Sequence, residues 1–195
     1  VVSNIYSPGT SIECNEHYTE TNNLLSIFIE NEEQLNNTKK IYVAGISIID
    51  VSTGKNIIYQ TSSCIDDKNI GLDEIYRFIN IHNPREIIIH MKNMDISKND
   101  LLKYLEIENK NVHIYNENLD TNVFKNSYQN QFLEKIFPDK GLLSVIEYLD
   151  LERLPYGVIS YLFLLRFAND HNSTVIEKIH KPVIWDKNNY LSLSH

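Results

Sequence analysis

The sequence predicts an α/β protein in which a domain with a mixed β-sheet is followed by a helical segment. Two observations carry this prediction. Short runs rich in β-branched residues occupy the first part of the chain, and helical spacing of apolar residues then alternates with further short runs. From about residue 126 the spacing of apolar residues becomes helical. The expected order over roughly residues 24–116 is β-β-β-α-β-α-β.

Three strands are expected first, as runs of β-branched and aromatic residues bounded by polar clusters. Gly54 supplies the dihedral angles of a tight hairpin turn between the second and the third strand. Residues 31–40 are expected to form a solvated loop between the first two strands. The three strands cover residues 24–29, 41–51 and 56–62.

Two helices and two further strands complete the expected sheet domain. Pro84 ends the first helix because proline cannot continue it, and Ser97 caps the second helix. The apolar run that begins at Glu86 lacks alternation, which is typical of a buried parallel strand. The helices cover residues 72–79 and 97–105, and the strands cover residues 86–90 and 112–115. Because crossovers between parallel strands are right-handed, this layout predicts an RNase H-like fold for residues 1–122.

Residues 123–195 are expected to begin a second, all-α domain. Helices are predicted over residues 129–136 and 142–149, and residues 156–168 are apolar on nearly every side. A helix that is apolar all round must be buried all round. The residues that follow are too few to cover it, so we expect this helical segment to be incomplete within the chain.

The charge balance argues against a free-standing nucleic-acid-binding protein. The net charge is −8 and the isoelectric point is near 5.3, so the chain lacks the overall basic character that phosphate binding favours. Short basic clusters are candidates for contacts with a DNA backbone, although most such clusters are solvated surface. Their members are Lys39, Lys40, Lys178 and Lys181.

The cysteines and histidines do not predict a metal or redox site. Cys14 and Cys64 are far apart and have no CxxC partner, which indicates buried thiols in a reducing compartment. His90 and His113 end neighbouring predicted strands, but no third ligand has suitable spacing, so two structural histidines are expected. No run of about 18 apolar residues occurs, so no membrane span is expected.

A metal-dependent nuclease is the enzymatic alternative. Such chemistry gathers several carboxylates on two Mg²⁺ ions, and the first carboxylate stands in the middle of the first strand. Here that position holds Ser26, and Glu30 lies at the far end of the strand. Asp50 and Glu74 would complete the set, but Asp50 is also well placed to bond to the turn that follows it. Because the central acid is missing, we expect no catalytic site and no metal in this chain.

Several stretches, in order along nearly the whole chain, resemble the MutS family of DNA mismatch-repair proteins. None of them is specific alone, so the resemblance rests on their colinearity. Ser194 stands where the family has Asp, which departs from the last motif. Residues 1–2 with 7–10 (SPGT), 22–27 (NNLLSI), 45–54 (GISIIDVSTG) and 83–88 (NPREII) resemble the connector domain, and residues 141–149 (GLLSVIEYL) and 189–193 (NYLSL) resemble the start of the helical core.

The resemblance implies a connector that couples the binding of mismatched double-stranded DNA to a distant ATPase domain. A complete protein of this family would act with a second MutS subunit, bind ATP and Mg²⁺ in a P-loop domain, and recruit a MutL-type partner. This chain contains no G-x-x-x-x-G-K-[ST] motif, so no cofactor is expected within it. The alternative is a stand-alone RNase H-like protein-interaction module.

Two further stretches resemble one branch of the family and thereby imply a cellular location. Residues 149–152 (LDLE) and 160–165 (SYLFLL) are similar to the MutS branch of giant viruses and octocoral mitochondria. That similarity implies an intracellular location, which would be a viral factory, the cytoplasm or a mitochondrion.

Overall fold

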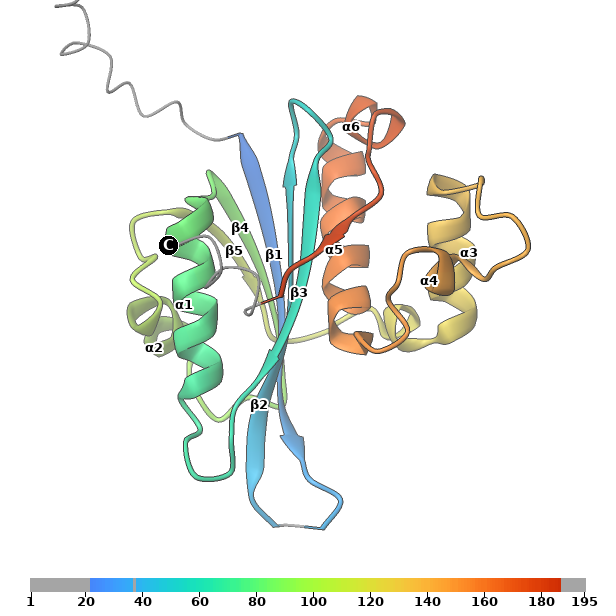
Figure 1. Ribbon diagram of the computed structural model, residues 1–195. Helices are drawn as coiled ribbons and strands as arrows, with labels where there is room; N and C mark the ends of the chain where they lie inside the picture. Colours follow the sequence, from blue (N-terminus) through green and yellow to red (C-terminus); the bar gives the residue numbers. More distant parts are fainter. Residues whose placement is uncertain (1–21, 37, 187–195) are drawn as a thin grey trace, which may run out of the picture.

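The computed structural model describes residues 22–36 and 38–186. Within these ranges six strands form one mixed sheet in the order β5-β4-β1-β2-β3-β6 (Figure 1). β1, β2 and β3 are antiparallel neighbours, whereas β4 pairs parallel with β1 and β5 pairs parallel with β4. The strands are β1 (Asn23–Glu33), β2 (Lys40–Asp50), β3 (Asn56–Ser62), β4 (Glu86–Lys92), β5 (Asn111–Tyr115) and β6 (Val183–Ile184).

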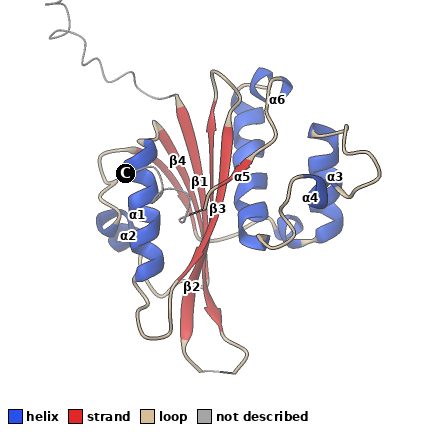
Figure 2. Ribbon diagram, viewed as in Figure 1, coloured by secondary structure: helices blue, strands red, loops and turns tan. Residues whose placement is uncertain are grey.

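Helices lie on both faces of this sheet (Figure 2). α1 and α2 cover one face and α5 covers the other. α3 and α4 lie beyond α5, on its side away from the sheet (Figure 1). None of the described helices is long and apolar enough to cross a bilayer. The helices are α1 (Ile70–His82), α2 (Lys98–Tyr104), the 3-10 helix η2 (Thr121–Phe124), α3 (Asn126–Ile136), α4 (Val145–Tyr148), α5 (Pro155–His171) and α6 (Thr174–Glu177).

The predicted order β-β-β-α-β-α-β is confirmed, and the five strands around β1 have the RNase H-like layout. β1 is longer than expected, because it continues to Glu33 as a hairpin ladder with β2 through part of the predicted loop. The sequence does not predict β6, which pairs with β3, because two residues are too few to show alternation. The helix expected over residues 142–149 is shortened to α4, which begins after a capping box between Ser144 and Glu147.

Some sequence predictions lie outside the described residues. They are the family-like stretches at residues 1–10 and 189–193, and Cys14. Cys64 is described, and it is exposed rather than buried as expected. Its position in the loop between β3 and α1, where its amide bonds to the Asp67 carbonyl, explains the exposure.

Side-chain alternation along β1 explains why both faces of the sheet are buried. Leu25, Ile27 and Ile29 belong to the apolar cluster under α1 and α2, whereas Leu24 and Phe28 belong to the cluster under α5. Residues of both sets are almost completely buried. A central strand covered on both faces therefore reads as a continuous apolar run, as β1 does.

α5 is buried as its apolar sequence predicts, but residues of this same chain cover it, which the sequence did not lead us to expect. Every residue from Gly157 to Leu165 is buried, and the sheet, η2, α3 and α6 all contact the helix. The expectation that α5 lacks a cover within this chain is therefore wrong. The division into domains at residues 122 and 123 stays a prediction, although α5 shares one core with Phe28 and Ile58 of the sheet.

Candidate functional site

Two consecutive residues of α5 attach the helix to the sheet through buried polar contacts. The Ser160 hydroxyl donates to the carbonyl oxygen of Ser26 on β1 at 2.8 Å, and its oxygen lies 2.9 Å from that of Ser47 on β2. The Tyr161 hydroxyl donates to Oδ1 of Asn56 on β3 at 2.7 Å. Because an unsatisfied buried polar group is costly, these contacts specify one position of α5 on the sheet.

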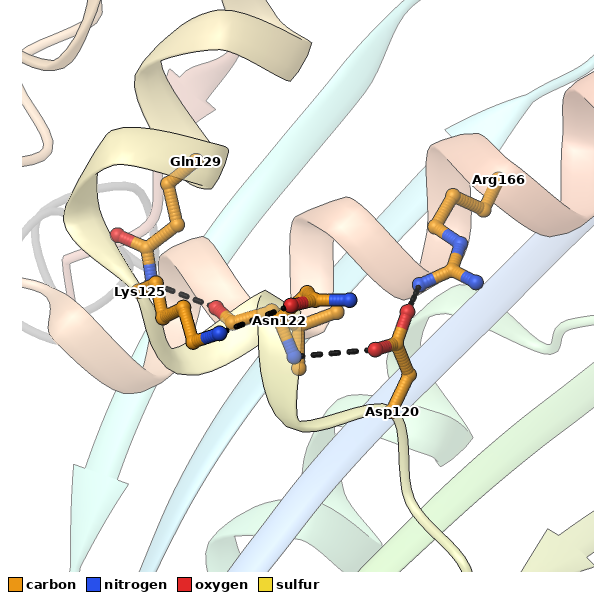
Figure 3. A network of polar contacts seen from close by, with 6 residues as sticks. Asp120, Asn122, Lys125, Gln129 and Arg166 are labelled. Atoms are coloured by element: carbon orange, nitrogen blue, oxygen red, sulfur yellow. Dashed lines mark hydrogen bonds and ion pairs between the residues drawn. The ribbon is translucent and has the colours of Figure 1, made fainter.

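The far end of α5 is joined to the chain segment that follows β5 (Figure 3). Arg166 Nη1 lies 2.7 Å from Asp120 Oδ2, and Asp120 Oδ1 accepts a hydrogen bond of 3.0 Å from the Asn122 amide. The Asn122 amide, followed by the Arg166 guanidinium, holds the pKa of the Asp120 carboxyl below its usual range. Asp120 therefore caps η2 and binds α5 with the same carboxylate.

Side chains on both sides of the η2–α3 boundary extend this connection. Gln129 Nε2 donates to the Val123 carbonyl oxygen at 2.7 Å, and Lys125 Nζ donates to Asn122 Oδ1 at 3.1 Å (Figure 3). We call the set of Asp120, Asn122, Lys125, Gln129 and Arg166 the junction. It links α5, and through α5 the sheet, to α3.

A pocket of about 270 Å³ lies beside the junction, where β4 and β5 end. The carboxyl ends of parallel strands are where open α/β sheets bind ligands. The buried His90 ring stacks on Phe163 of α5, with ring centres 3.6 Å apart, and on Tyr115 at 5.0 Å. Burial, together with the Arg166 charge, lowers the pKa of His90 to about 4, so its imidazole is neutral at pH 7. We call this the His90 pocket.

The two histidines considered from the sequence have separate surroundings. His90 pairs with Tyr115 in the β4–β5 register, whereas His113 lies opposite Ile88. His113 Nε2 lies 2.7 Å from Glu86 Oε1. Within residues 22–36 and 38–186, no group of three His, Cys, Asp or Glu side chains is arranged to hold a metal ion.

The carboxylates of the nuclease alternative also lie apart. Asp50 accepts hydrogen bonds of 2.9 Å from the Ser52 amide and the Thr53 hydroxyl, which confirms its expected role in the turn. Glu30 lies 3.0 Å from Lys92 Nζ, seven positions along the β1–β2 ladder from the pair that contains Asp50. Glu74 lies on α1, on the opposite face of the sheet from α5. These three residues therefore cannot share a metal ion.

The candidate DNA-contacting lysines fall into two separate groups. Lys40 begins β2, whereas the Lys178 backbone lies beside Gly54, beyond the other end of β2. An eleven-residue strand is about 35 Å long, so the two groups cannot form one patch. Lys181 Nζ lies 3.8 Å from Asp150 Oδ2 and 4.6 Å from the centre of the Tyr148 ring. That these lysines contact DNA stays a prediction.

Sequence reasoning missed the junction and the His90 pocket. One signal was present, since Arg166 is the only charged residue between positions 155 and 168. A single charge in an apolar helix is expected to have a partner. Asp120 two residues before Asn122 also has the pattern of an Asx turn, but nothing in the sequence pairs it with Arg166.

Comparisons with known proteins identify the family of this chain. No protein-family model matches it. One solved structure with some likeness is T. thermophilus RuvC in complex with Holliday junction substrate. The match covers 77% of this chain and 96% of the RuvC chain, with 9% identity and a TM-score of 0.33. A likeness of that size says nothing about the activity of this chain.

A sequence relative is far more similar. It is a putative DNA mismatch repair protein, a mutS homolog of Acanthamoeba polyphaga mimivirus, and it is 34% identical over 211 aligned positions. The alignment covers 98% of this chain, which spans only 19% of the relative's length. Which branch of the family is involved stays a prediction. Because the identity extends through nearly all of its residues, the chain belongs to the MutS family.

Proposed function

We propose that this chain is the connector of a MutS-type mismatch-repair protein together with the first part of its helical core. The observation that carries the proposal is the 34% identity to the mimivirus mutS homolog through 98% of the chain. In this role the chain has no catalytic site of its own. The complete protein would bind mismatched duplex DNA with a second MutS subunit, use ATP and Mg²⁺ in a separate domain, and engage a MutL-type protein.

The arrangement around α5 supports a coupling role. Ser160 and Tyr161 hold α5 on three strands, and the Arg166–Asp120 pair joins the end of α5 to η2 and α3. A displacement of α3 would therefore act on α5 and on the loop after β5. Coupling between distant sites needs an element whose position both sites influence, and a set of connected contacts of this kind can provide one.

A stand-alone interaction module is the second candidate, and one observation favours it. The sheet and neighbouring helices bury α5 within the described residues, so this body has a closed core. The flanking reading frame discriminates between the two candidates. The proposed connector requires a Walker A motif downstream of His195, and a frame that contains only these residues would overturn it in favour of the module.

The coupling itself is testable in the complete protein with the variant Arg166→Gln. We expect the stimulation of ATP hydrolysis by mismatched DNA to fall about fivefold or more, which is the usual size of an allosteric coupling. Basal hydrolysis and mismatch affinity should change less than about twofold, because Arg166 would contact neither ligand. Steady-state ATPase assays with matched and mismatched duplexes provide the measurement.

The control for that experiment is Lys103→Gln, which removes an exposed charge of the same sign on α2. It should leave the stimulation unchanged. An Arg166→Gln protein with normal folding and full stimulation would contradict the coupling role of the junction.

A further inference from the structure

The His90 pocket carries an excess of negative charge that has no part in the proposed function. Its lining includes the carboxylates of Glu117, Asp120 and Asp170 and one cation, Arg166. Asp120 is already paired with Arg166. Glu117 and Asp170 are exposed, and neither has a hydrogen bond or an ion pair with any residue that the structure describes. The pocket therefore has two unpaired negative charges at its rim.

A buried polar side chain in the same pocket also lacks a partner. The His90 side chain is nine-tenths buried, with a relative exposure of 9%. Its Nδ1 is inaccessible and unbonded, and neither ring nitrogen makes a hydrogen bond within the described part of the chain. Buried polar groups in folded proteins nearly always have a partner, so an unmatched imidazole that lines a pocket points to a ligand. Because Nδ1 is inaccessible, the nitrogen of the neutral ring that can accept a hydrogen bond from a ligand is Nε2.

The shape and chemistry of the walls narrow the choice of ligand. The rings of Tyr115, Phe163 and Phe167 line the pocket together with His90. A guanidinium group is planar, stacks on aromatic faces and donates hydrogen bonds in its plane, whereas an ammonium group is compact and strongly hydrated. Arg166 already provides an example, since its guanidinium binds Asp120 at this site. A phosphate would instead meet the uncompensated carboxylates.

We propose that the His90 pocket binds an arginine side chain presented by a partner protein. Glu117 and Asp170 bind the guanidinium, Tyr115 stacks on it, and Nε2 of His90 accepts one of its hydrogen bonds. The proposal goes beyond the connector role and does not depend on it, because neither DNA nor ATP takes part in the contact.

The binding is tested with N-acetyl-arginine amide as the probe and the complete chain as the target. The ring resonances of His90 and Tyr115 should shift saturably in NMR spectra, with a dissociation constant on the order of 1 mM. N-acetyl-citrulline amide has nearly the same shape without the charge and should cause no saturable shift. N-acetyl-lysine amide should bind more weakly than the arginine probe.

Single substitutions assign the contacts. Glu117→Gln and Asp170→Asn should each weaken binding of the arginine probe about three- to tenfold, because each removes one charge-assisted contact at an exposed site. His90→Phe keeps a ring against Phe163 and should reduce the preference for the arginine over the lysine probe. The matched control is Glu108→Gln, an exposed carboxylate that precedes β5 at the end opposite Tyr115, and it should have no effect.

Three results would overturn the inference. They are equal shifts with the citrulline probe, saturable binding of inorganic phosphate or AMP at the same residues, and no saturable shift with the arginine probe. Asp170 and Glu117 are exposed, so their variants remain informative even if His90→Phe fails to fold. A failure here would leave the mismatch-repair proposal intact, because that proposal is tested by the reading frame and the ATPase assay.

Discussion

The pKa of His90 differs between the folded and the unfolded protein because its ring is buried where β4 ends. Its ring is held between Phe163 and Tyr115, and burial keeps it neutral. In the unfolded chain the same imidazole has an ordinary pKa near 6.5. The unfolded chain therefore binds a proton between about pH 6.5 and pH 4 that the folded protein does not bind.

This difference predicts a loss of stability in acid. The contribution of His90 is fully present above about pH 6.5 and is lost as the pH falls through 4, with a total of about 3 kcal/mol. Urea denaturation at pH 7.5 and pH 4.5 measures it. Wild type should lose about 2 kcal/mol more free energy of unfolding over this interval than His90→Phe, which cannot titrate.

Other groups titrate in the same pH range, and the variant serves as their control. Burial also lowers the pKa of His82, but His82 is present in both proteins and its contribution cancels in the comparison. Equal losses of stability in wild type and His90→Phe would show that the imidazole is not buried in its neutral form.

At the scale of elements, the contact between α5 and β2 is unusually close. A Cβ atom on Gly45 would lie 1.9 Å from the Tyr156 carbonyl oxygen and 2.6 Å from the Gly157 amide nitrogen. These are backbone atoms of the first turn of α5, which a rotamer change cannot move away. α5 can therefore pack this closely on β2 only because Gly45 has no side chain.

Gly45→Ala is expected to destabilise the protein by about 3 kcal/mol or more, because α5 must shift and break its contacts with the sheet. Gly141→Ala is the matched control, since a Cβ there meets no atom within 4 Å and only the positive φ of +64° opposes it. That variant should cost about 1 kcal/mol. Chemical denaturation compares the two, and similar losses would argue against the close approach.

Sequence patterns predicted the sheet elements well because each depends on local chemistry. β-branched runs, Pro84 and the Ser97 cap mark the ends of elements without reference to the rest of the chain. The cover of α5 depends instead on which surface lies opposite, and an all-round apolar helix does not specify that surface. The pairing of Arg166 with Asp120 and the approach of Tyr115 to His90 likewise arise only from tertiary structure.

At the scale of the whole molecule, the distance between the two lysine groups decides whether one DNA duplex could contact both. The group around Lys40 and the group around Lys178 are separated by the length of β2, about 35 Å. To contact both groups, one duplex would have to extend about 35 Å across the surface, which is about ten base pairs. With a net charge of −8, the chain offers little other attraction for phosphate.

Two double variants of the complete protein test these contacts, Lys39→Gln with Lys40→Gln and Lys178→Gln with Lys181→Gln. Each should reduce the slope of log Kd against log salt concentration by about 2, because each removes two phosphate contacts. Their effects should add, since the groups lie far apart. Unchanged slopes in binding assays with mismatched duplex would identify the lysines as solvated surface.

β6 covers the start of the outer edge of β3. Val183 and Ile184 pair with Ile57 and Ile58, and the Trp185 amide donates to the Ile58 carbonyl oxygen at 2.8 Å. Without this short strand, the start of β3 would present unpaired amide and carbonyl groups, which form a template for edge-to-edge aggregation. A segment far along the sequence from β3 thus pairs with part of an edge that would otherwise be open to another chain.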